Sequence, residues 1–227
     1  MRRLLTTGII QTIALLLFSG LAAGGEFENV LAKAEKGDPN AQNYLGMMYF
    51  QGRGVGQDFA KALEWFHKSA KKGHASAMNN IGIIYYTGKG VLQNYAAAME
   101  WFTKSAQKDY PDAQYNLGLM YYHGRSDPFD NSGAPQDFEK ALHWFRKAAA
   151  LGHASAHNNI GIMYFKGQGV EQDFQEAFIW NWLAIEMGNR NALQMKRKIR
   201  QKLSDAEIDA AKAEAQRRTQ KPEPESS

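Results

Sequence analysis

The chain has 227 residues, of which 44% are apolar and 12% aromatic, and it carries a formal net charge of +4. This composition is sufficient to bury a core and excludes a disordered or fibrous protein. The chain has no cysteine, which excludes disulfides, thiol catalysis and cysteine-ligated zinc, so packing alone must hold the fold.

The first 22 residues have the layout of a secretory signal peptide. Arg2 and Arg3 precede an apolar run over residues 9–18, and small residues follow it. We expect cleavage near Ala22 to Gly24 and a periplasmic or secreted protein. The alternative, a retained membrane anchor, is disfavoured because the run is shorter than the ~20 residues that a spanning helix needs. No stable membrane insertion is expected after cleavage.

Cleavage would remove two arginines and no acidic residue, which lowers the net charge from +4 to +2. Basic and acidic residues alternate along the predicted helices instead of forming a stripe. The positive charge therefore does not indicate a nucleic-acid partner.

Four segments repeat one pattern of glycine and tryptophan at nearly constant spacing. Glycines that follow Leu or Ile and precede a Tyr by three residues recur at Gly46, Gly82, Gly118 and Gly161. Tryptophans recur at Trp65, Trp101, Trp144 and Trp180. The glycine spacings are 36, 36 and 43, and the tryptophan spacings are 36, 43 and 36. An insert of seven residues must therefore lie between Arg125 and Gln136.

Each repeat is predicted to form two short helices joined by a turn. In the first repeat Ala41, Leu45 and Tyr49 share a face of the first helix, and Trp65 lies on the core face of the second. Glycines are expected to end the helices, since glycine adopts the left-handed backbone that closes them. The second helices are expected to start at acidic or amide N-caps, which are Asp58, Asn94, Asp137 and Asp173.

Helix pairs this short bury too little surface alone, so we expect them to stack into an all-α solenoid of antiparallel helix pairs over residues 23–218. The predicted repeats are 41–76, 77–112, 113–155 and 156–191. A capping helix is expected in 26–40 and further capping helices in 192–218, the last starting at a capping box of Ser204 and Glu207. Residues 219–227 lack an apolar pattern and are expected to be disordered.

The recurring Ala-x-x-x-Leu/Ile-Gly-x-x-Tyr, Gly-x-Gly-Val-x-x-Asp and Ala-x-x-Trp resemble the Sel-one-like repeat family, which is related to the tetratricopeptide repeats. The resemblance covers residues 26–218 and departs in the third repeat, where the insert replaces Gly-x-Gly-Val. It implies a right-handed superhelix that serves as an adaptor or binding scaffold for protein partners, often in bacterial envelopes. Fold alone does not fix that function.

Two Ser-x-x-Lys strings, at Ser69 to Lys72 and Ser105 to Lys108, raise an alternative function. Cysteine-rich relatives of the family are associated with penicillin binding, so the alternative is a β-lactam or cell-wall hydrolase. The Ser-Asp-Asn and Lys-Thr-Gly elements that such a serine nucleophile needs do not occur in the chain. We therefore expect no enzyme activity and no catalytic residue.

His153 and His157 are four residues apart, a spacing that places two metal ligands on one helical face. His153 repeats His74, however, directly after a helix-closing glycine, which favours a turn. We expect no metal and no cofactor.

The side of each first helix that faces away from the core is not polar. This pattern indicates that both sides of the helix are buried, or that one side is buried and the other binds a partner. We predict a groove for a protein or peptide partner along these helices, lined by aromatic and amide side chains. The predicted groove residues are Asn43, Phe50, Gln51, Asn79, Tyr86, Thr87, Tyr115, Tyr122, His123, Asn158, Phe165 and Lys166.

Overall fold

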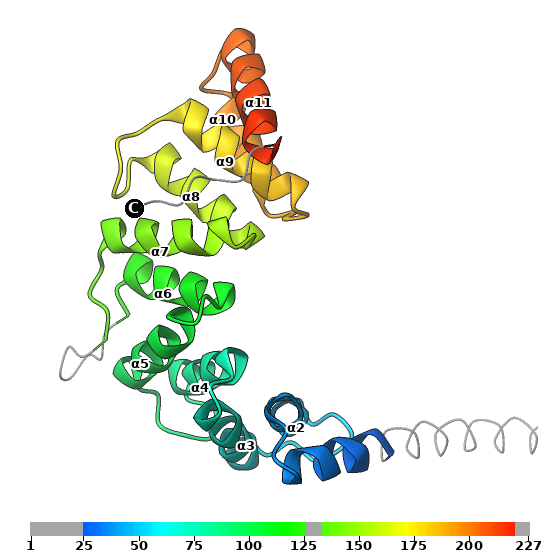
Figure 1. Cartoon of the computed structure of the whole chain (residues 1–227). Helices are drawn as coiled ribbons and strands as arrows, with labels where there is room; N and C mark the ends of the chain where they lie inside the picture. The colour runs from blue at the N-terminus through cyan, green and yellow to red at the C-terminus, as the bar shows by residue number, and fades with distance from the viewer. Residues whose placement is uncertain (1–24, 126–132, 221–227) are drawn as a thin grey trace, which may run out of the picture. The chain divides into compact units, whose positions relative to one another are not determined.

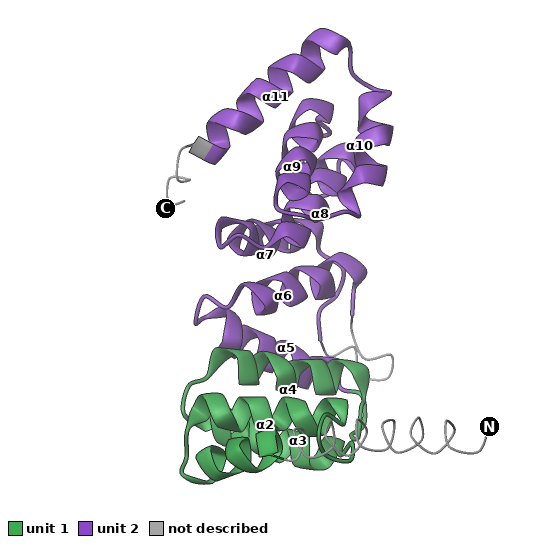
Figure 2. Cartoon of the chain, turned by 90° about the vertical axis from the view of Figure 1, so that its right-hand side faces the viewer, with its two compact units in different colours: residues 1–93 green, residues 94–227 purple. Residues whose placement is uncertain are grey.

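The computed structural model describes residues 25–125 and 133–220. The chain divides into two compact units, Met1–Gln93 and Asn94–Ser227 (Figure 2). The predicted leader, residues 1–22, lies outside the described residues, and so does the chain after Gln220. None of the helices in the described ranges is long and apolar enough to cross a membrane.

Unit 1 contains a helix over residues 25–35, followed by α2 (Pro39–Gln51), α3 (Phe59–Lys71) and α4 (Ala75–Thr87). Helix α3 packs against α2 and α4 (Figure 1). The helix over residues 25–35 covers the start of α2 with Ala34, which packs with Ala41 and Leu45. A capping helix was expected over residues 26–40; the helix observed there ends at residue 35, and α2 begins within that range at Pro39.

The described residues of unit 2 form seven helices in chain order. They are α5 (Tyr95–Ala106), α6 (Pro111–His123), α7 (Phe138–Ala150), α8 (Ala154–Lys166), α9 (Phe174–Glu186), α10 (Ala192–Arg200) and α11 (Asp205–Gln220). Each helix from α5 to α10 packs against the next one, and α11 returns to pack on α9 (Figure 1). The predicted all-α fold of consecutive helix pairs is confirmed. Helix α11 also includes the first two residues of the predicted tail.

The second helix of every repeat starts at the predicted cap. The Oδ1 atoms of Asp58, Asn94, Asp137 and Asp173 accept the amide N–H three residues later, at 3.0, 2.7, 2.9 and 2.9 Å. The first helices end at glycines with positive φ, as predicted. Capping is a local interaction, which is why the sequence alone locates it.

A phenylalanine, and not the tryptophan before it, occupies the centre of the first three repeats. Phe66, Phe102 and Phe145 are at most 2% exposed, whereas Trp65, Trp101 and Trp144 are half-buried. The prediction that tryptophan fills the interior is wrong there, and only Trp180 among the four is buried. One residue advances a helix by about 100°, which carries the phenylalanine to the middle of the apolar stripe and the indole to its edge.

The repeating glycines make room for these rings. A Cβ atom added at Gly46 would lie 2.6 Å from the ring of Phe66, and one at Gly118 would lie 2.5 Å from the ring of Phe145. Any larger residue would force the two helices of the repeat apart.

Each half-buried indole carries a lysine on its ring. The Nζ atoms of Lys68, Lys104 and Lys147, three residues after the tryptophans, lie 3.7, 4.4 and 5.2 Å from the ring centroids. These cation–π contacts explain why the outer side of helix two is both aromatic and basic.

Polar and apolar contacts hold α11 on α9. Ile208, Ala211 and Ala215 are buried in the cluster between the two helices. Arg218 donates to both carboxylate oxygens of Glu176, at 2.6 and 3.0 Å, which raises the pKa of the guanidinium. The predicted capping box is confirmed, because the N–H of Ser204 donates to Glu207 at 2.7 Å and its Oγ accepts the N–H of Glu207 at 3.3 Å.

Candidate functional site

The twelve predicted groove residues form three rows on the first helices α2, α4, α6 and α8. The inner row is Asn43, Asn79, Tyr115 and Asn158. The aromatic row is Phe50, Tyr86, Tyr122 and Phe165. The outer row is Gln51, Thr87, His123 and Lys166. The outer row is exposed, whereas the inner and aromatic rows are half-buried, apart from Asn79, which is buried.

Contacts between helices occupy the amides of the inner row. Asn80 of α4 donates its Nδ2 to Oδ1 of Asn43 at 3.0 Å, and Asn181 of α9 donates to Oδ1 of Asn158 at 3.2 Å. Asn79 is only 4% exposed. These asparagines join neighbouring helices and leave little surface for a ligand.

Tyr115, the remaining member of the inner row, lies between two side chains of α8 and its cap. Its ring stacks on His153, with centroids 4.3 Å apart and planes 22° apart, and its hydroxyl is hydrogen-bonded to Asn159. Burial raises the pKa of Tyr115. The inner row is therefore used mainly for contacts between helices, within a repeat at Asn158 and with the next repeat at Asn43 and Tyr115.

The aromatic row is half-buried against the start of the second helices. Phe50, Tyr122 and Phe165 contact the phenylalanines that begin the following helices, with ring centroids 5.4, 5.4 and 5.5 Å apart. Residues of the next repeat also contact two of these aromatic side chains. The Nζ of Lys89 lies 5.0 Å from the Phe50 ring, and the hydroxyl of Tyr122 donates to Gln168 at 2.9 Å. One edge of each ring remains at the surface.

A glutamine clamp, which the sequence analysis missed, fixes the backbone of the aromatic row. The carbonyls of Phe50, Tyr86, Tyr122 and Phe165 accept from the side-chain amides of Gln57, Gln93, Gln136 and Gln172, at 2.9, 2.7, 3.0 and 2.8 Å. The available signal was a glutamine directly before the N-cap in all four repeats. The clamp ties the end of helix one to the start of helix two.

The outer row is exposed in all four repeats. The hydroxyl of Thr87 donates to the carbonyl of Ile83 in the same helix at 2.7 Å, and Lys166 donates to the Tyr122 hydroxyl at 3.2 Å. Partial burial, together with the nearby Arg125 and Lys166, lowers the pKa of His123. The surface that a partner could reach thus consists of the outer row and the edges of the aromatic row.

The first helices are almost uncharged. Helices α2 and α4 contain no Asp, Glu, Lys or Arg, while α6 contains only Asp112 and α8 only Lys166. The second helices carry more charged residues; α3, for example, contains Lys61, Lys68 and Lys71. A surface of amides and aromatic edges can form hydrogen bonds and apolar contacts with a peptide.

His153 is the N-cap of α8, as its turn position suggested. Its Nδ1 accepts the N–H of Ala156 at 3.2 Å, and its Nε2 lies 3.5 Å from Asp112. The hydrogen bond from His153 lowers the pKa of the Asp112 carboxyl. Both ring nitrogens are thus engaged within the protein. The described residues contain no group of three or more His, Cys, Asp or Glu side chains that could hold a metal ion.

A similar cap contact occurs at the start of α4, whereas Tyr110, the N-cap of α6, forms no side-chain cap hydrogen bond. His74 accepts the N–H of Ala77 at 3.2 Å and lies 3.1 Å from Oδ1 of Asn40 in the repeat before. Asn189, which precedes α10, donates to Ser155 at 3.3 Å. The residue that caps one helix therefore also binds the previous repeat.

The serine of the first Ser-x-x-Lys string has a structural role. Ser69 is 0% exposed and donates its hydroxyl to the carbonyl of Pro39 at 2.7 Å. Lys72 donates to the carbonyl of Gly37. Ser105 is equally buried. This geometry argues against a serine nucleophile.

Most of the segment that contains the insert of the third repeat, residues 126–132, lies outside the described residues. On either side of it the repeat is in register. The N–H of Ala134 donates to the carbonyl of Arg125 at 2.9 Å, and Ala134 is fully buried. The helices that follow thus keep the same arrangement as in the other repeats.

The Sel1 repeat family model matches residues 39–74, 75–110, 111–153 and 154–189. The chain belongs to the Sel1 repeat family. The matched repeats begin two residues earlier than those predicted from the sequence, at the first residues of α2, α4, α6 and α8. The comparison with curated proteins finds no significant match.

Solved structures are similar to this Sel1 repeat protein over most of its length. A protective antigen of uropathogenic Escherichia coli with an SLR fold is 38% identical, with a TM-score of 0.67 over 73% of this chain and 34% of the antigen. A Sel1 repeat protein from Oxalobacter formigenes is 34% identical, with a TM-score of 0.67 over 78% and 49%. An immunity protein from Pseudomonas aeruginosa, 22% identical with a TM-score of 0.52 over 75% and 60%, shares the fold alone. The Sel1 repeat protein spans about a third and about half of the first two relatives.

Proposed function

We propose that this Sel1 repeat protein is an exported scaffold without catalytic activity, which binds a protein or peptide partner on the first-helix surfaces of its repeats. Sel1 repeat proteins generally mediate protein–protein interactions. The observation that carries the proposal is the absence of charge on α2 and α4 beside an exposed row of polar side chains. A surface that is not needed for folding and avoids charge suits hydrogen bonding to a peptide backbone.

Export is part of the proposal and rests on the residues of the leader. Cell fractionation followed by N-terminal sequencing of the mature protein tests it. A mature N-terminus near Ala22 to Gly24 in the exported fraction is the expected result. A chain that keeps Met1 and remains in the cytoplasm would contradict export.

Charge placed in the outer row tests the surface without touching the core. We expect a double variant, Gln51→Glu with Thr87→Glu, to recover less than about a tenth of the partner from envelope extracts, because a desolvated unpaired charge weakens binding strongly. The matched control, Ala60→Glu with Gln107→Glu, adds two carboxylates at exposed positions on second helices and should recover the wild-type amount.

Circular dichroism should show that both double variants are folded. Equal recovery by the two would refute the first-helix surface. Loss of the partner from both variants would mean that net charge governs the binding, and that result would also refute the assignment.

A further inference from the structure

One segment departs from the alternation of charge expected along the helices. Residues 187–204 contain six of the chain's 27 cationic side chains and none of its 23 acidic ones. They are Arg190, Lys196, Arg197, Lys198, Arg200 and Lys202. Without this segment the net charge of the chain would be negative. We call residues 187–204 the basic segment.

Most of these charged side chains are exposed to solvent. Ala192 and Ile199 fix α10 in the core, each at 0% exposure, while Lys196 rests on the ring of Trp182 at 4.2 Å. On one flank of this core face Leu193, Arg197 and Arg200 are exposed at spacings of four and three residues, which place them on one side of a helix. Arg190, one turn earlier, extends this row. We call these four residues the arginine stripe.

The described residues supply no ion pair for the stripe. None of its arginines lies within salt-bridge distance of a carboxylate there. The hydrogen bond with Lys212 is the main reason why the pKa of Asp209 is lowered, and the charge of Arg200 contributes only weakly.

The helix dipole accounts for only part of the stripe. Cations in a last turn stabilise a helix, and Arg197 and Arg200 lie in the last turn of α10. Arg190 precedes the first turn of the same helix, where the dipole disfavours a cation. It also follows the C-cap of α9, Met187, where the dipole favours a cation, so the two dipoles act on Arg190 with opposite sign.

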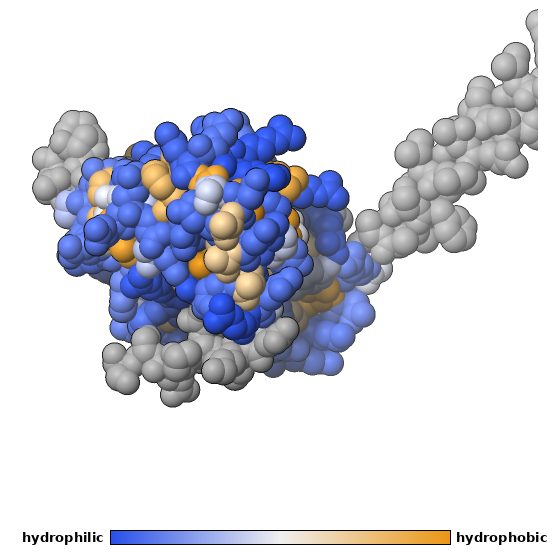
Figure 3. Space-filling model, turned by 90° about the horizontal axis from the view of Figure 1, so that it is seen from above, coloured by the Kyte–Doolittle hydropathy of each residue, from blue (hydrophilic) through white to orange (hydrophobic). Residues whose placement is uncertain are grey.

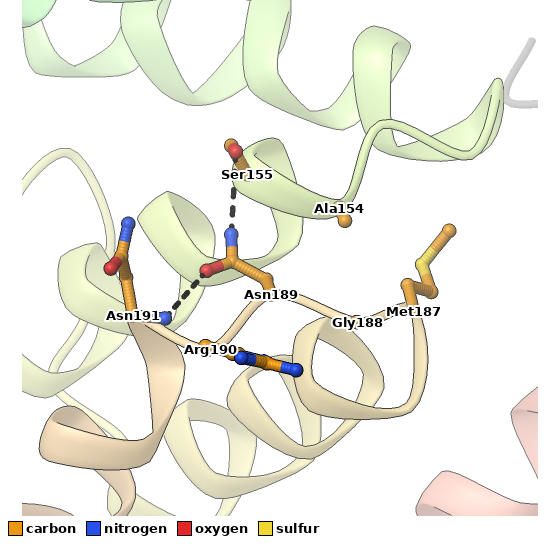
Figure 4. Close-up of a pocket in the computed structure, with 7 residues that line it drawn as sticks. All are labelled: Ala154, Ser155, Met187, Gly188, Asn189, Arg190 and Asn191. Carbon is orange, nitrogen blue, oxygen red and sulfur yellow. Dashed lines mark hydrogen bonds between the residues drawn. The ribbon is translucent and has the colours of Figure 1, made fainter. Parts of the chain in front are cut away.

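Arg190 lines a surface recess of about 410 Å³ together with Met187, Ala154 and Ser155. Asn189 at its centre bonds to Ser155 and to the N–H of Asn191, and Arg190 bonds to none of the residues drawn (Figure 4). Met187 and Leu193 are 43% and 49% exposed. The recess thus offers a free guanidinium next to apolar surface.

We propose that the arginine stripe is a second docking surface, which binds an acidic segment of a protein partner. The planar guanidinium forms paired hydrogen bonds with carboxylates. From Arg190 to Arg200 the stripe spans about 15 Å at the rise of a helix, which matches about five residues of an extended acidic peptide. This surface is separate from the first-helix rows and stands if that proposal fails.

A protein partner fits better than a bilayer or DNA. The apolar side of α10 is buried against α9, so the helix has no apolar face to insert into lipid. Seen from above, the surface is mostly hydrophilic and its apolar residues form small separate areas (Figure 3). Asp205 and Asp209 on α11 limit the positive surface to the length of the stripe, so a short peptide segment fits within it, whereas the longer phosphate backbone of a duplex would extend over these carboxylates.

Fluorescence anisotropy with a labelled deca-glutamate peptide tests the proposal on the full chain. The variant is Arg190→Gln with Arg197→Gln and Arg200→Gln. The control removes the same charge at exposed sites in unit 1, by Lys33→Gln with Lys36→Gln and Lys71→Gln. At about threefold per exposed charge, we expect the stripe variant to bind at least about tenfold more weakly and the control to bind within about twofold of wild type.

Three outcomes would overturn the proposal. The first is no binding of the peptide by the wild-type chain at low salt. The second is equal weakening by the control, which would mean that net charge alone is responsible. The third is tighter binding, through the same stripe, to phosphatidylglycerol vesicles or to duplex DNA than to the peptide. Retention of partner recovery by the Gln51→Glu/Thr87→Glu variant would leave this result unaffected.

Discussion

Truncation of Phe145 tests which residue holds the repeat together. Phe145 is 0% exposed in a cluster with Ala141, Leu142, Ile160 and Met163, and its ring fills the space above Gly118. For Phe145→Ala, the lost burial of the ring costs about 2 to 3 kcal/mol. A glycine cannot fill the cavity left behind, which adds about 1 to 2 kcal/mol, so we expect a loss near 4 kcal/mol.

Trp144→Ala is the matched control, since it removes a larger ring from the position directly before Phe145. Trp144 is half-buried with Lys147 on its face, so we expect a loss of about 1 to 2 kcal/mol, in proportion to its smaller buried area. Urea unfolding followed by far-UV circular dichroism measures both, provided that the m-values are unchanged. If Trp144→Ala costs as much as Phe145→Ala, or more, the assignment of the core is wrong.

Three further predictions follow from the site. Gln136→Ala should lower the free energy of unfolding by about 1 kcal/mol through loss of the clamp, whereas exposed Gln107→Ala should be neutral; equal effects would refute the clamp. Burial lowers the pKa of His74 in the folded protein. As the pH falls through about 6.5, the imidazole is therefore protonated in the unfolded chain before it is protonated in the folded chain. The Tm should consequently drop between pH 7.5 and 5. His74→Asn keeps an N-cap and should lose less Tm over that range, and an unchanged pH dependence would count against the cap. A fluorescent penicillin should not label the protein, and labelling that Ser69→Ala abolishes would restore the hydrolase alternative.

The repeat, its caps and its turns could be predicted because they depend on local chemistry. Asp58 caps a helix whatever its neighbours are, and Gly52 allows the left-handed backbone that ends α2. A fixed spacing then shows that the unit recurs. Stacking follows, because a pair of short helices cannot bury its apolar side alone.

The core register could not be predicted because two adjacent apolar residues are equivalent in sequence. Trp65 and Phe66 both fit an apolar stripe, and the larger indole was the natural choice. The close approach of Gly46 decides between them, and that approach lies between helices. In the fourth repeat Asn181 replaces the phenylalanine and is fully buried, a change that the repeated tryptophan conceals.

The binding surface was predicted too broadly for a similar reason. The sequence shows which side of α2 projects away from the core, but not that Asn80, 37 residues later, bonds to Asn43. His74 and Asn40 are likewise 34 residues apart. Such contacts depend on how neighbouring first helices align. The outer row remains exposed, although Lys166 contacts Tyr122 of the repeat before it, and it is the part of the prediction that the structure leaves accessible.

Site-specific photo-crosslinking in intact cells tests the central claim most directly. A photoreactive amino acid would be placed at Gln51 or Thr87, the outer-row residues of unit 1, or at exposed Gln107, which follows the second helix α5. The account predicts crosslinks to the same protein partner from both outer-row positions and none from position 107. Crosslinks from position 107 alone, or no protein crosslink from either outer-row position, would contradict it.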